Sequence, residues 1–297
     1  MQCDKCMRNA VLFQEYSGQH LCKQHFEADV EAKAKHEIRR HRWMTPGDHI
    51  AVALSGDQGS TALLYFLKKL TSNRRDIRIS AISVDEGIAG YRDPEYTVRI
   101  AELLDTPCIL GSFQESFRIT LDEIVHTKGQ LTCTYCRVLR NYLLDRIAME
   151  YGVTKLALGC TLDEGAGMVL KNLLRGIPER LVVSKRVARG KIPLIRPFIS
   201  VPHKEVALYA DLHVKICDQS LCPYKDTPFE KDVQTLLNEF SIRHPATKYA
   251  LMSLEKNLGG ACVSIADSIP LCEKCGQYTD GICGDCHIIS EVVAHGC

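Results

Sequence analysis

Short apolar runs alternate with amphipathic segments along most of the chain. Four runs have the length and continuous apolar character of buried parallel strands: residues 48–54, 77–84, 108–110 and 155–158. The segment after the first run instead repeats apolar residues at helical spacing, with a stripe at Leu63, Leu64, Phe66, Leu67 and Leu70. Alternating strands and helices predict an α/β fold with a parallel sheet covered on both faces.

Further helices follow from capping signals and periodicity. Asp93 followed by Pro94 is typical of a helix start, because aspartate caps the first turn and proline suits its first position. Helical spacing continues at 137–151 and 164–174. After Pro193 the chain is predicted to be mainly helical, at residues 203–211, 229–240 and 247–257.

Two cysteine groups near the chain ends have the spacing of closed tetrahedral zinc sites. Their ligands are Cys3, Cys6, Cys22 and His25 in the first group, and Cys272, Cys275, Cys283 and Cys286 in the second. Paired ligands two residues apart reach one ion from a tight turn. Such short segments cannot build an apolar core, so bound metal must supply their folding energy. We therefore expect two Zn²⁺ ions.

A third group consists of Cys133, Cys136 and the distant Cys222. Three thiolates suit an iron–sulfur cluster better than structural zinc, because one iron is left open. Four other cysteines are interpreted as core or surface thiols, with Cys217 as an alternative spare ligand: Cys108, Cys217, Cys262 and Cys297. No run of 18 apolar residues occurs, and the 15 cysteines fit metal ligands in a reducing compartment, so we expect a cytoplasmic protein.

The net charge of +1 gives no overall basic signal for nucleic acid. Basic residues nevertheless gather in one short segment, where Glu37 is the single acid: Lys33, Lys35, Arg39, Arg40 and Arg42. This segment is either the solvated face of a helix or a contact patch for a phosphate backbone.

The segment Ser55–Ser60 joins the first predicted strand to the amphipathic helix that follows it, and it contains two glycines. Backbone amides of such a loop can cradle a phosphate at the helix N-terminus. The Gly-Lys-Ser/Thr of a Walker loop is absent, so the loop alone is a weak signal.

Several motifs together resemble one known family. They are the two terminal knuckles, the strand before Ser55, Val84-Asp85-Glu86-Gly87-Ile88, Cys133-Thr134-Tyr135-Cys136, Asn172-Leu173-Leu174-Arg175-Gly176, Cys222-Pro223-Tyr224 and His244-Pro245-x-Thr247-Lys248-Tyr249. The chain resembles the PP-loop ATP pyrophosphatase family of tRNA thiolation enzymes, in particular the TtuA-type tRNA 2-thiouridine synthetases. The resemblance covers nearly the whole chain.

The resemblance implies a fold, a reaction and a set of sites. ATP would adenylate C2 of a tRNA uridine, and sulfur delivered through a [4Fe–4S] cluster would displace AMP. The cluster ligands would be Cys133, Cys136 and Cys222, which would also be the catalytic residues. Nucleotide and Mg²⁺ contacts would fall on Ala53, Ser55, Ser60, Val84, Arg140, Gly159 and Asp163. Implied partners are tRNA, a sulfur donor (sulfide or a sulfur-carrier protein) and a second subunit, either a copy of this chain or an active paralogue.

The chain departs from the family pattern in both nucleotide motifs. The family loop is Ser-Gly-Gly-x-Asp-Ser, often with Lys as x, whereas Asp57, Gln58 and Gly59 stand at its three middle positions. A carboxylate about 4 Å from a phosphate charge costs about 4 kcal/mol at an effective dielectric near 20. In the second motif Cys160 replaces a histidine and Gly167 a glutamine, while Asp163 is kept.

Three functions therefore stand as hypotheses. The first is a tRNA 2-thiouridine synthetase with a [4Fe–4S] cluster. The second is a paralogue inactive toward ATP that carries the cluster and sulfur or binds tRNA as a partner subunit. The third is an iron–sulfur enzyme that handles sulfur without ATP. The expected architecture is an adenine nucleotide α-hydrolase-like PP-loop domain at 48–267, with zinc knuckles at 1–27 and 268–297 and a basic connecting helix at 28–47.

Overall fold

A five-stranded parallel sheet forms the centre of the protein. The computed structural model describes residues 1–177, 191–216, 220, 222–224, 228–261, 272–275 and 281–295. The strands are β3 (His49–Ala53), β4 (Arg78–Asp85), β5 (Cys108–Ser112), β6 (Lys155–Ala157) and β7 (Leu194–Ile195), in the order β5-β4-β3-β6-β7. In the register of the central strand, Ile50 pairs with Ile79 of β4 and with Lys155 of β6.

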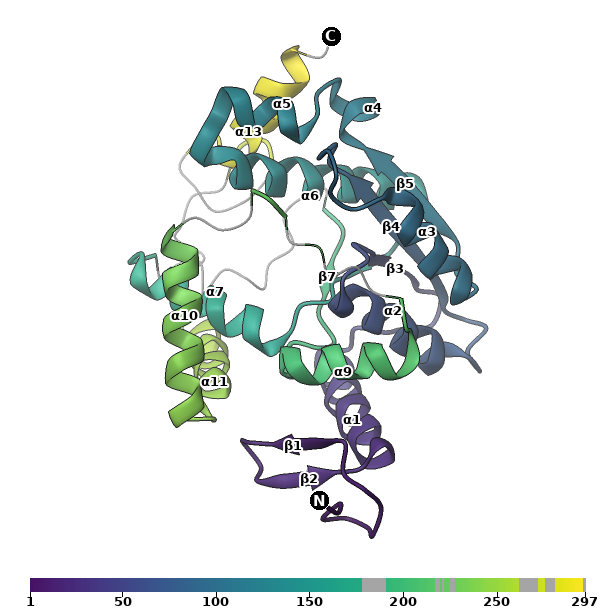
Figure 1. Cartoon of the computed structure of the whole chain (residues 1–297). Helices are drawn as coiled ribbons and strands as arrows, with labels where there is room; N and C mark the ends of the chain where they lie inside the picture. The colour runs from purple at the N-terminus through teal and green to yellow at the C-terminus, as the bar shows by residue number, and fades with distance from the viewer. Residues whose placement is uncertain are drawn as a thin grey trace.

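Helices cover both faces of this sheet (Figure 1). Side chains of β3 alternate between the two cores, since Ile50 and Val52 belong to one and Ala51 to the other. The first core takes residues from α1 (Lys23–His41), α2 (Gln58–Thr71), α3 (Pro94–Leu103) and α9 (His203–His213). The second takes residues from α4 (Phe113–Phe117), α5 (Leu121–Lys128), α6 (Thr132–Glu150) and α13 (Gly284–His295). The predicted α/β fold is confirmed.

The strand order creates a switch point next to β3. From β3 the chain moves outward to β4 and β5, then returns to the other side of β3 to form β6 and β7. In open α/β sheets, ligands bind at the carboxyl ends of the strands at such a point. Ser55 follows β3 and Gly159 follows β6, so both nucleotide motifs meet there.

The predicted helix starts agree with the structure at some positions and differ at others. Asp93 caps α3, accepting a hydrogen bond from the Glu95 amide at 2.9 Å, as predicted. Helix α6 begins at Thr132 rather than at 137, directly after the 3₁₀ turn η1 (Gly129–Leu131), and no side chain caps its start. Cys133 and Cys136 therefore lie in the first turns of a helix, not in the loop before it. The short helices α4 and α5 were not predicted.

The N-terminal segment forms a hairpin of β1 (Leu12–Gln14) and β2 (Gln19–Leu21), at the opposite end of the molecule from α13 (Figure 1). Helix α1 begins at Lys23, earlier than the predicted 28. Glu205 of α9 ties the hairpin to the sheet layer, because its buried carboxylate accepts hydrogen bonds from Tyr16 at 2.7 Å and Gln14 at 3.2 Å. Lys33 pairs with the same carboxylate at 3.1 Å.

Three helices beyond β6 pack beside one another: α7 (Leu162–Leu174), α10 (Pro228–Arg243) and α11 (Thr247–Ala261). Lys248 of α11 pairs with Asp163 at the start of α7 at 2.5 Å. The last part of the chain, predicted only as a knuckle, contains the twelve-residue helix α13. None of the described helices combines the length and apolar character that crossing a bilayer requires.

Candidate metal centres and the cavity between them

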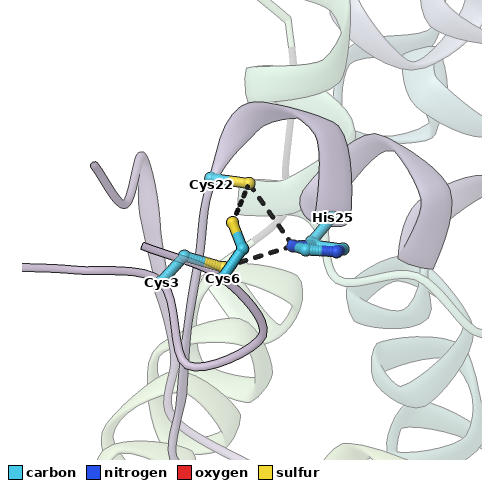
Figure 2. Close-up of side chains that lie close together, drawn as sticks. All are labelled: Cys3, Cys6, Cys22 and His25. Atoms are coloured by element: carbon cyan, nitrogen blue, oxygen red, sulfur yellow. Dashed lines mark hydrogen bonds between the residues drawn. The ribbon is translucent and has the colours of Figure 1, made fainter. Parts of the chain in front are cut away.

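The N-terminal ligand group is assembled by the structure. The Sγ atoms of Cys6 and Cys22 are 3.6 Å apart, and Nδ1 of His25 lies 3.3 Å from Cys3 Sγ and 3.4 Å from Cys22 Sγ (Figure 2). Zn–S bonds of about 2.3 Å in a tetrahedron place two sulfurs about 3.8 Å apart. The four atoms therefore have the spacing that one zinc-sized ion needs. The first turn of α1 supplies His25, and Cys22 directly precedes that helix.

The electrostatics of this group favour a thiolate. Burial alone would raise the pKa of Cys3, but hydrogen bonds from the backbone of Cys22 and Lys5 outweigh it and lower the pKa to about 6. A thiolate is the form that binds metal.

The C-terminal group has the same construction. Cys272 and Cys286 are 3.9 Å apart and Cys275 and Cys283 3.5 Å, measured between Sγ atoms. The Cys283 amide donates to the Cys272 sulfur at 3.3 Å, and hydrogen bonds from the backbone of Cys283 and Cys275 lower the pKa of Cys272 to about 6. Within the described ranges, these two terminal groups are the ones whose ligand atoms all lie within 4.8 Å of one another.

A cavity of about 510 Å³ lies at the switch point of the sheet. Nine of the ten residues predicted to bind the cluster or the nucleotide line it: Ala53, Ser55, Ser60, Val84, Cys133, Cys136, Arg140, Gly159 and Cys222. The cavity thus joins the glycine loop after β3 to the thiols at the start of α6.

The three thiols of this cavity are not among the described groups whose ligand atoms all lie within 4.8 Å of one another, so they are more widely spaced than the terminal groups. A cluster with a separate iron for each thiolate needs wider spacing than a single ion, so this arrangement is compatible with one. Cys133 Sγ donates to the backbone oxygen of Tyr224 at 2.8 Å, and the Tyr224 hydroxyl donates to Asp122 of α5 at 2.8 Å. Burial raises the pKa of the Cys136 thiol to about 12, while the nearby Arg140 acts in the opposite direction.

Backbone amides of the glycine loop, Ser55–Ser60, donate hydrogen bonds to side chains of the same loop. Asp57 caps α2, and its Oδ1 accepts a hydrogen bond from the Ser60 amide at 2.8 Å. The Ser60 hydroxyl accepts one from the Ser55 amide at 3.2 Å. Two of the loop amides, those of Ser55 and Ser60, therefore already have partners within the protein, and the Ser60 amide is one that a phosphate at this helix N-terminus would use.

The residues of the second nucleotide motif, 159–167, lie in two places, some at the cavity and others against the helices beyond β6. Gly159 packs against Gly59 so closely that a Cβ added to Gly59 would lie 2.7 Å from the Gly159 oxygen. Cys160 lines the cavity, where burial and then the charge of Glu164 raise its pKa to about 11. Asp163 does not line the cavity, since its carboxylate accepts hydrogen bonds from Lys248 at 2.5 Å and from the His203 amide at 2.6 Å.

One charged pair of the cavity was not predicted. Arg140 Nη1 donates to Glu86 Oε1 at 3.2 Å, and the Glu86 side chain is 8% exposed. Six acidic residues line the cavity beside the two arginines Arg92 and Arg140: Asp57, Asp85, Glu86, Asp93, Glu164 and Glu230. This excess of acids disfavours a polyphosphate unless cations accompany it. The sequence alone could not predict this group, because its members come from distant segments of the chain and meet only in the folded structure.

The basic segment divides into two parts. Lys33 and Lys35 are engaged on α1, pairing with Asp29 at 2.6 Å and Glu31 at 2.9 Å respectively. Arg39, Arg40 and Arg42 are exposed at the end of that helix. Of the cysteines outside the three groups, Cys108 is half-buried in β5, whereas Cys217, Cys262 and Cys297 lie outside the described residues.

A parallel sheet with a loop and a helix N-terminus at its switch point is the architecture of doubly wound α/β proteins, whose ligands bind at that point. Sequence comparison gives the family. Residues 26–216 match the PP-loop domain model, and residues 2–27 match the model described as the N-terminal LIM domain of 2-thiouridine synthetase TtuA. The chain belongs to the PP-loop family of tRNA 2-thiolation proteins, which confirms the predicted resemblance.

Relatives match along most or nearly all of the chain. The tRNA 2-thiolation protein NcsA of Haloferax volcanii is 33% identical over an alignment of 325 residues, gaps included, which covers 99% of this chain and 100% of that protein. The cytoplasmic tRNA 2-thiolation protein 1 of Kluyveromyces lactis is 34% identical over 256 residues, covering 82% and 68%. Among solved structures, the U34-tRNA thiolase NcsA from Methanococcus maripaludis with its [4Fe–4S] cluster superimposes with a TM-score of 0.83 at 26% identity, covering 98% of this chain and 96% of that chain.

Proposed function

We propose that this protein is a tRNA uridine 2-sulfurtransferase that carries a [4Fe–4S] cluster on Cys133, Cys136 and Cys222. The observation that carries the proposal is the shared cavity, which places all three thiols beside the glycine loop at the switch point of the sheet. Similarity to NcsA proteins over nearly the whole chain supports the same activity. The substrate is a tRNA, and the sulfur donor is sulfide or a sulfur-carrier protein.

The residues around the thiols suit a cluster. Cys133 and Cys136 lie at the N-terminus of α6, where the helix dipole and the charge of Arg140, one turn after Cys136, oppose the rise that burial gives to the pKa of the Cys136 thiol. Positive charge on a bound cluster would add to this stabilisation of the thiolate. A cluster held by three thiolates supplies one iron without a protein ligand, at which sulfur for transfer can be held. Cys222 is held close by through Tyr224, which contacts both Cys133 and α5.

We assign zinc to the two terminal groups. A Cys₃His set and a Cys₄ set at tetrahedral spacing are typical structural zinc ligands. With zinc bound, the two modules are closed sites with no open position for chemistry. Reduced thiolates at all three groups fit a cytoplasmic protein. A dimer, either with a copy of this chain or with an active paralogue, would complete the assembly that the family resemblance implies.

A second function is favoured by one observation at the glycine loop. The Asp57 carboxylate accepts the hydrogen bond of the Ser60 amide and adds a negative charge where a phosphate would bind. A subunit that holds the cluster and tRNA but leaves uridine activation to an ATP-competent paralogue fits this loop better than an ATP-binding enzyme does. The two functions differ in whether the isolated chain needs ATP and can use it.

The test uses the purified chain prepared without oxygen. We expect about four irons per chain, the content of one [4Fe–4S] cluster. The variant with Cys133→Ala, Cys136→Ala and Cys222→Ala should lose the iron and keep its zinc. The protein is then given unmodified tRNA and sulfide, with and without ATP and Mg²⁺, and 2-thiouridine is measured by mass spectrometry. ATP-dependent product supports the sulfurtransferase, and product only after a paralogue is added supports the second function. Iron retained by the triple variant would contradict both.

A further inference from the structure

Helix α13 connects the C-terminal metal group to the proposed cluster ligands. It begins at Gly284, between the metal ligands Cys283 and Cys286, and packs against α6 (Figure 1). The first turns of α6 contain Cys133 and Cys136. Val292 of α13 is buried in the core that α5 and α6 share, and Ile288 packs against the same core. The two Cys-x2-Cys turns are thus at the starts of two helices in direct contact.

Glu291 of α13 forms polar contacts with both α5 and α6. Its Oε2 accepts a hydrogen bond from the hydroxyl of Tyr135 at 2.7 Å, and its other oxygen forms an ion pair with Lys128 at the end of α5. The Lys128 ammonium also lies 5.4 Å from the centre of the Tyr135 ring. Tyr135 stands between Cys133 and Cys136 in the chain and is 6% exposed. The carboxylate therefore restrains the residue between the two thiols.

A second pair of residues also joins α13 to the start of α6. Asp285, which lies between Cys283 and Cys286, accepts hydrogen bonds from Arg137 at 3.3 and 3.5 Å, and Arg137 directly follows Cys136. The Arg137 side chain is 51% exposed, and exposed ion pairs contribute little. The Tyr135 bond is more enclosed, because the Tyr135 residue is only 6% exposed, although its acceptor Glu291 is 39% exposed. A hydrogen bond to a charged acceptor at such a place contributes more than an exposed ion pair.

We propose that Glu291 and Tyr135 are positioning residues that hold the Cys133–Cys136 turn, so that metal binding at the C-terminal group stabilises retention of the cluster. Metal at Cys283 and Cys286 orders the start of α13 and so holds Glu291 against Tyr135. By linkage the coupling is reciprocal, and a bound cluster should also tighten metal binding at the C-terminal group. This inference rests on the proposed function for the identity of the cluster.

The first experiment measures cluster retention in four proteins: the wild type, Tyr135→Phe, Glu291→Ala and the double variant. Each is reconstituted anaerobically, and release of iron to a chelator is followed by absorbance. Either single variant should release iron about tenfold faster, since a hydrogen bond to a charged acceptor is lost. The double variant should release it no faster than the singles, because the two residues act through one contact. Additive effects in the double variant would overturn the proposal.

Controls separate positioning from general loss of stability. Glu291→Gln keeps an acceptor for the Tyr135 hydroxyl and should restore slow release, whereas Glu150→Ala at the exposed far end of α6 should change nothing. The electron paramagnetic resonance spectrum of the reduced cluster should shift in Tyr135→Phe and should match that of the wild type in Glu291→Gln. An unshifted spectrum in Tyr135→Phe would contradict positioning of the thiols.

The second experiment needs no iron. In the variant with all three cluster cysteines replaced by alanine, Cys272→Ser is added and amide hydrogen exchange is measured over residues 129–140. Exchange should rise there while the N-terminal hairpin stays unchanged. Unchanged exchange over 129–140 would overturn the coupling. Failure of the proposed function has a different signature, namely that the wild-type chain holds no cluster at all.

Discussion

The carboxylate of Asp57 occupies the start of helix α2, where its Oδ1 accepts a hydrogen bond from the Ser60 amide at 2.8 Å. In a phosphate-binding loop this amide would face the ligand. The Asp57 backbone oxygen also accepts hydrogen bonds from the Ser60 hydroxyl at 3.3 Å and the Thr61 amide at 3.0 Å. The loop is therefore stabilised by an internal anion in the place of an external one.

Replacing that anion should open the loop to nucleotide. We expect the variant Asp57→Gly with Gln58→Lys to bind ATP and Mg²⁺ at least about tenfold more tightly than the wild type, because one negative charge is removed and one positive charge added. Loss of the cap should cost only a few tenths of a kcal/mol, since glycine is tolerated there. Anaerobic calorimetric titration measures the affinity, and thermal unfolding measures the cost of the lost cap. Asp57→Ser is the matched control, because it keeps a capping oxygen without the charge. Tight ATP binding by the wild type would contradict this account.

Restoring the family aspartate at position 59 should have the opposite effect. A Cβ on Gly59 would lie 2.7 Å from the backbone oxygen of Gly159, which no side-chain rotation can relieve. Adding Gly59→Asp to the two substitutions above is therefore expected to lower the melting temperature and to reduce the gain in ATP affinity. Thermal unfolding with and without ATP measures both effects. A stable triple variant with higher affinity would show that the loop can move away from Gly159.

The sequence was sufficient where chemistry depends on residues close together in the chain. The spacing of Cys272, Cys275, Cys283 and Cys286 predicted a group that the structure assembles, and the cap at Asp93 predicted the start of α3. It was insufficient where a partner comes from far away. Asp163 was assigned to the nucleotide site by its motif, but it is held by Lys248, 85 residues further on.

The role of Asp57 shows a different limit. Aspartate directly before a helix is a capping signal that the sequence contains, whereas its departure from the family pattern indicates only an added negative charge. Helix α13 was missed because the metal ligands dominate the pattern of the last residues. Its contact with Tyr135 is a tertiary one that no local pattern predicts.

The basic segment should bind RNA through only part of its charge. Arg39, Arg40 and Arg42 are exposed, so replacing them by glutamine should weaken tRNA binding and flatten the dependence of log affinity on log salt by about 0.9 per lost phosphate contact on a duplex. Lys33 and Lys35 are engaged in ion pairs, and their replacement should reduce stability and leave the salt slope unchanged. Filter binding at several salt concentrations distinguishes the two sets. Equal slopes for the wild type and the arginine variant would identify this segment as a solvated helix face.

The N-terminal metal group should be separable from the rest of the fold. In Cys6→Ser we expect loss of one zinc per chain and rapid trypsin cleavage after Lys5 and Arg8, because three-residue strands cannot hold a hairpin alone. Helix α1 should survive, since Phe26 and Val30 are fully buried against the sheet layer. Metal analysis and mass spectrometry of the fragments measure these outcomes. Loss of both zincs in this variant would mean that the two terminal groups do not fold independently.

The last prediction concerns Asp48, which ties the start of β3 to β6. Burial alone would raise the pKa of Asp48, but hydrogen bonds from Lys155, Thr45 and Thr154 outweigh it and lower the pKa to about 2. The folded pKa lies below the ordinary value of 3.8, so the stabilisation is fully present above about pH 4 and is lost as the pH falls toward 2. Asp48→Asn should therefore cost about 2 kcal/mol of unfolding free energy, equally at pH 6 and pH 8. Urea unfolding at the two pH values measures it, with Asp105→Asn as the control, because Asp105 is exposed and its positive φ of 46° is one that asparagine adopts. A cost that differs between pH 6 and pH 8 would assign the effect to another titrating group, and no cost at all would show that Lys155 and the two threonines find equivalent partners in water.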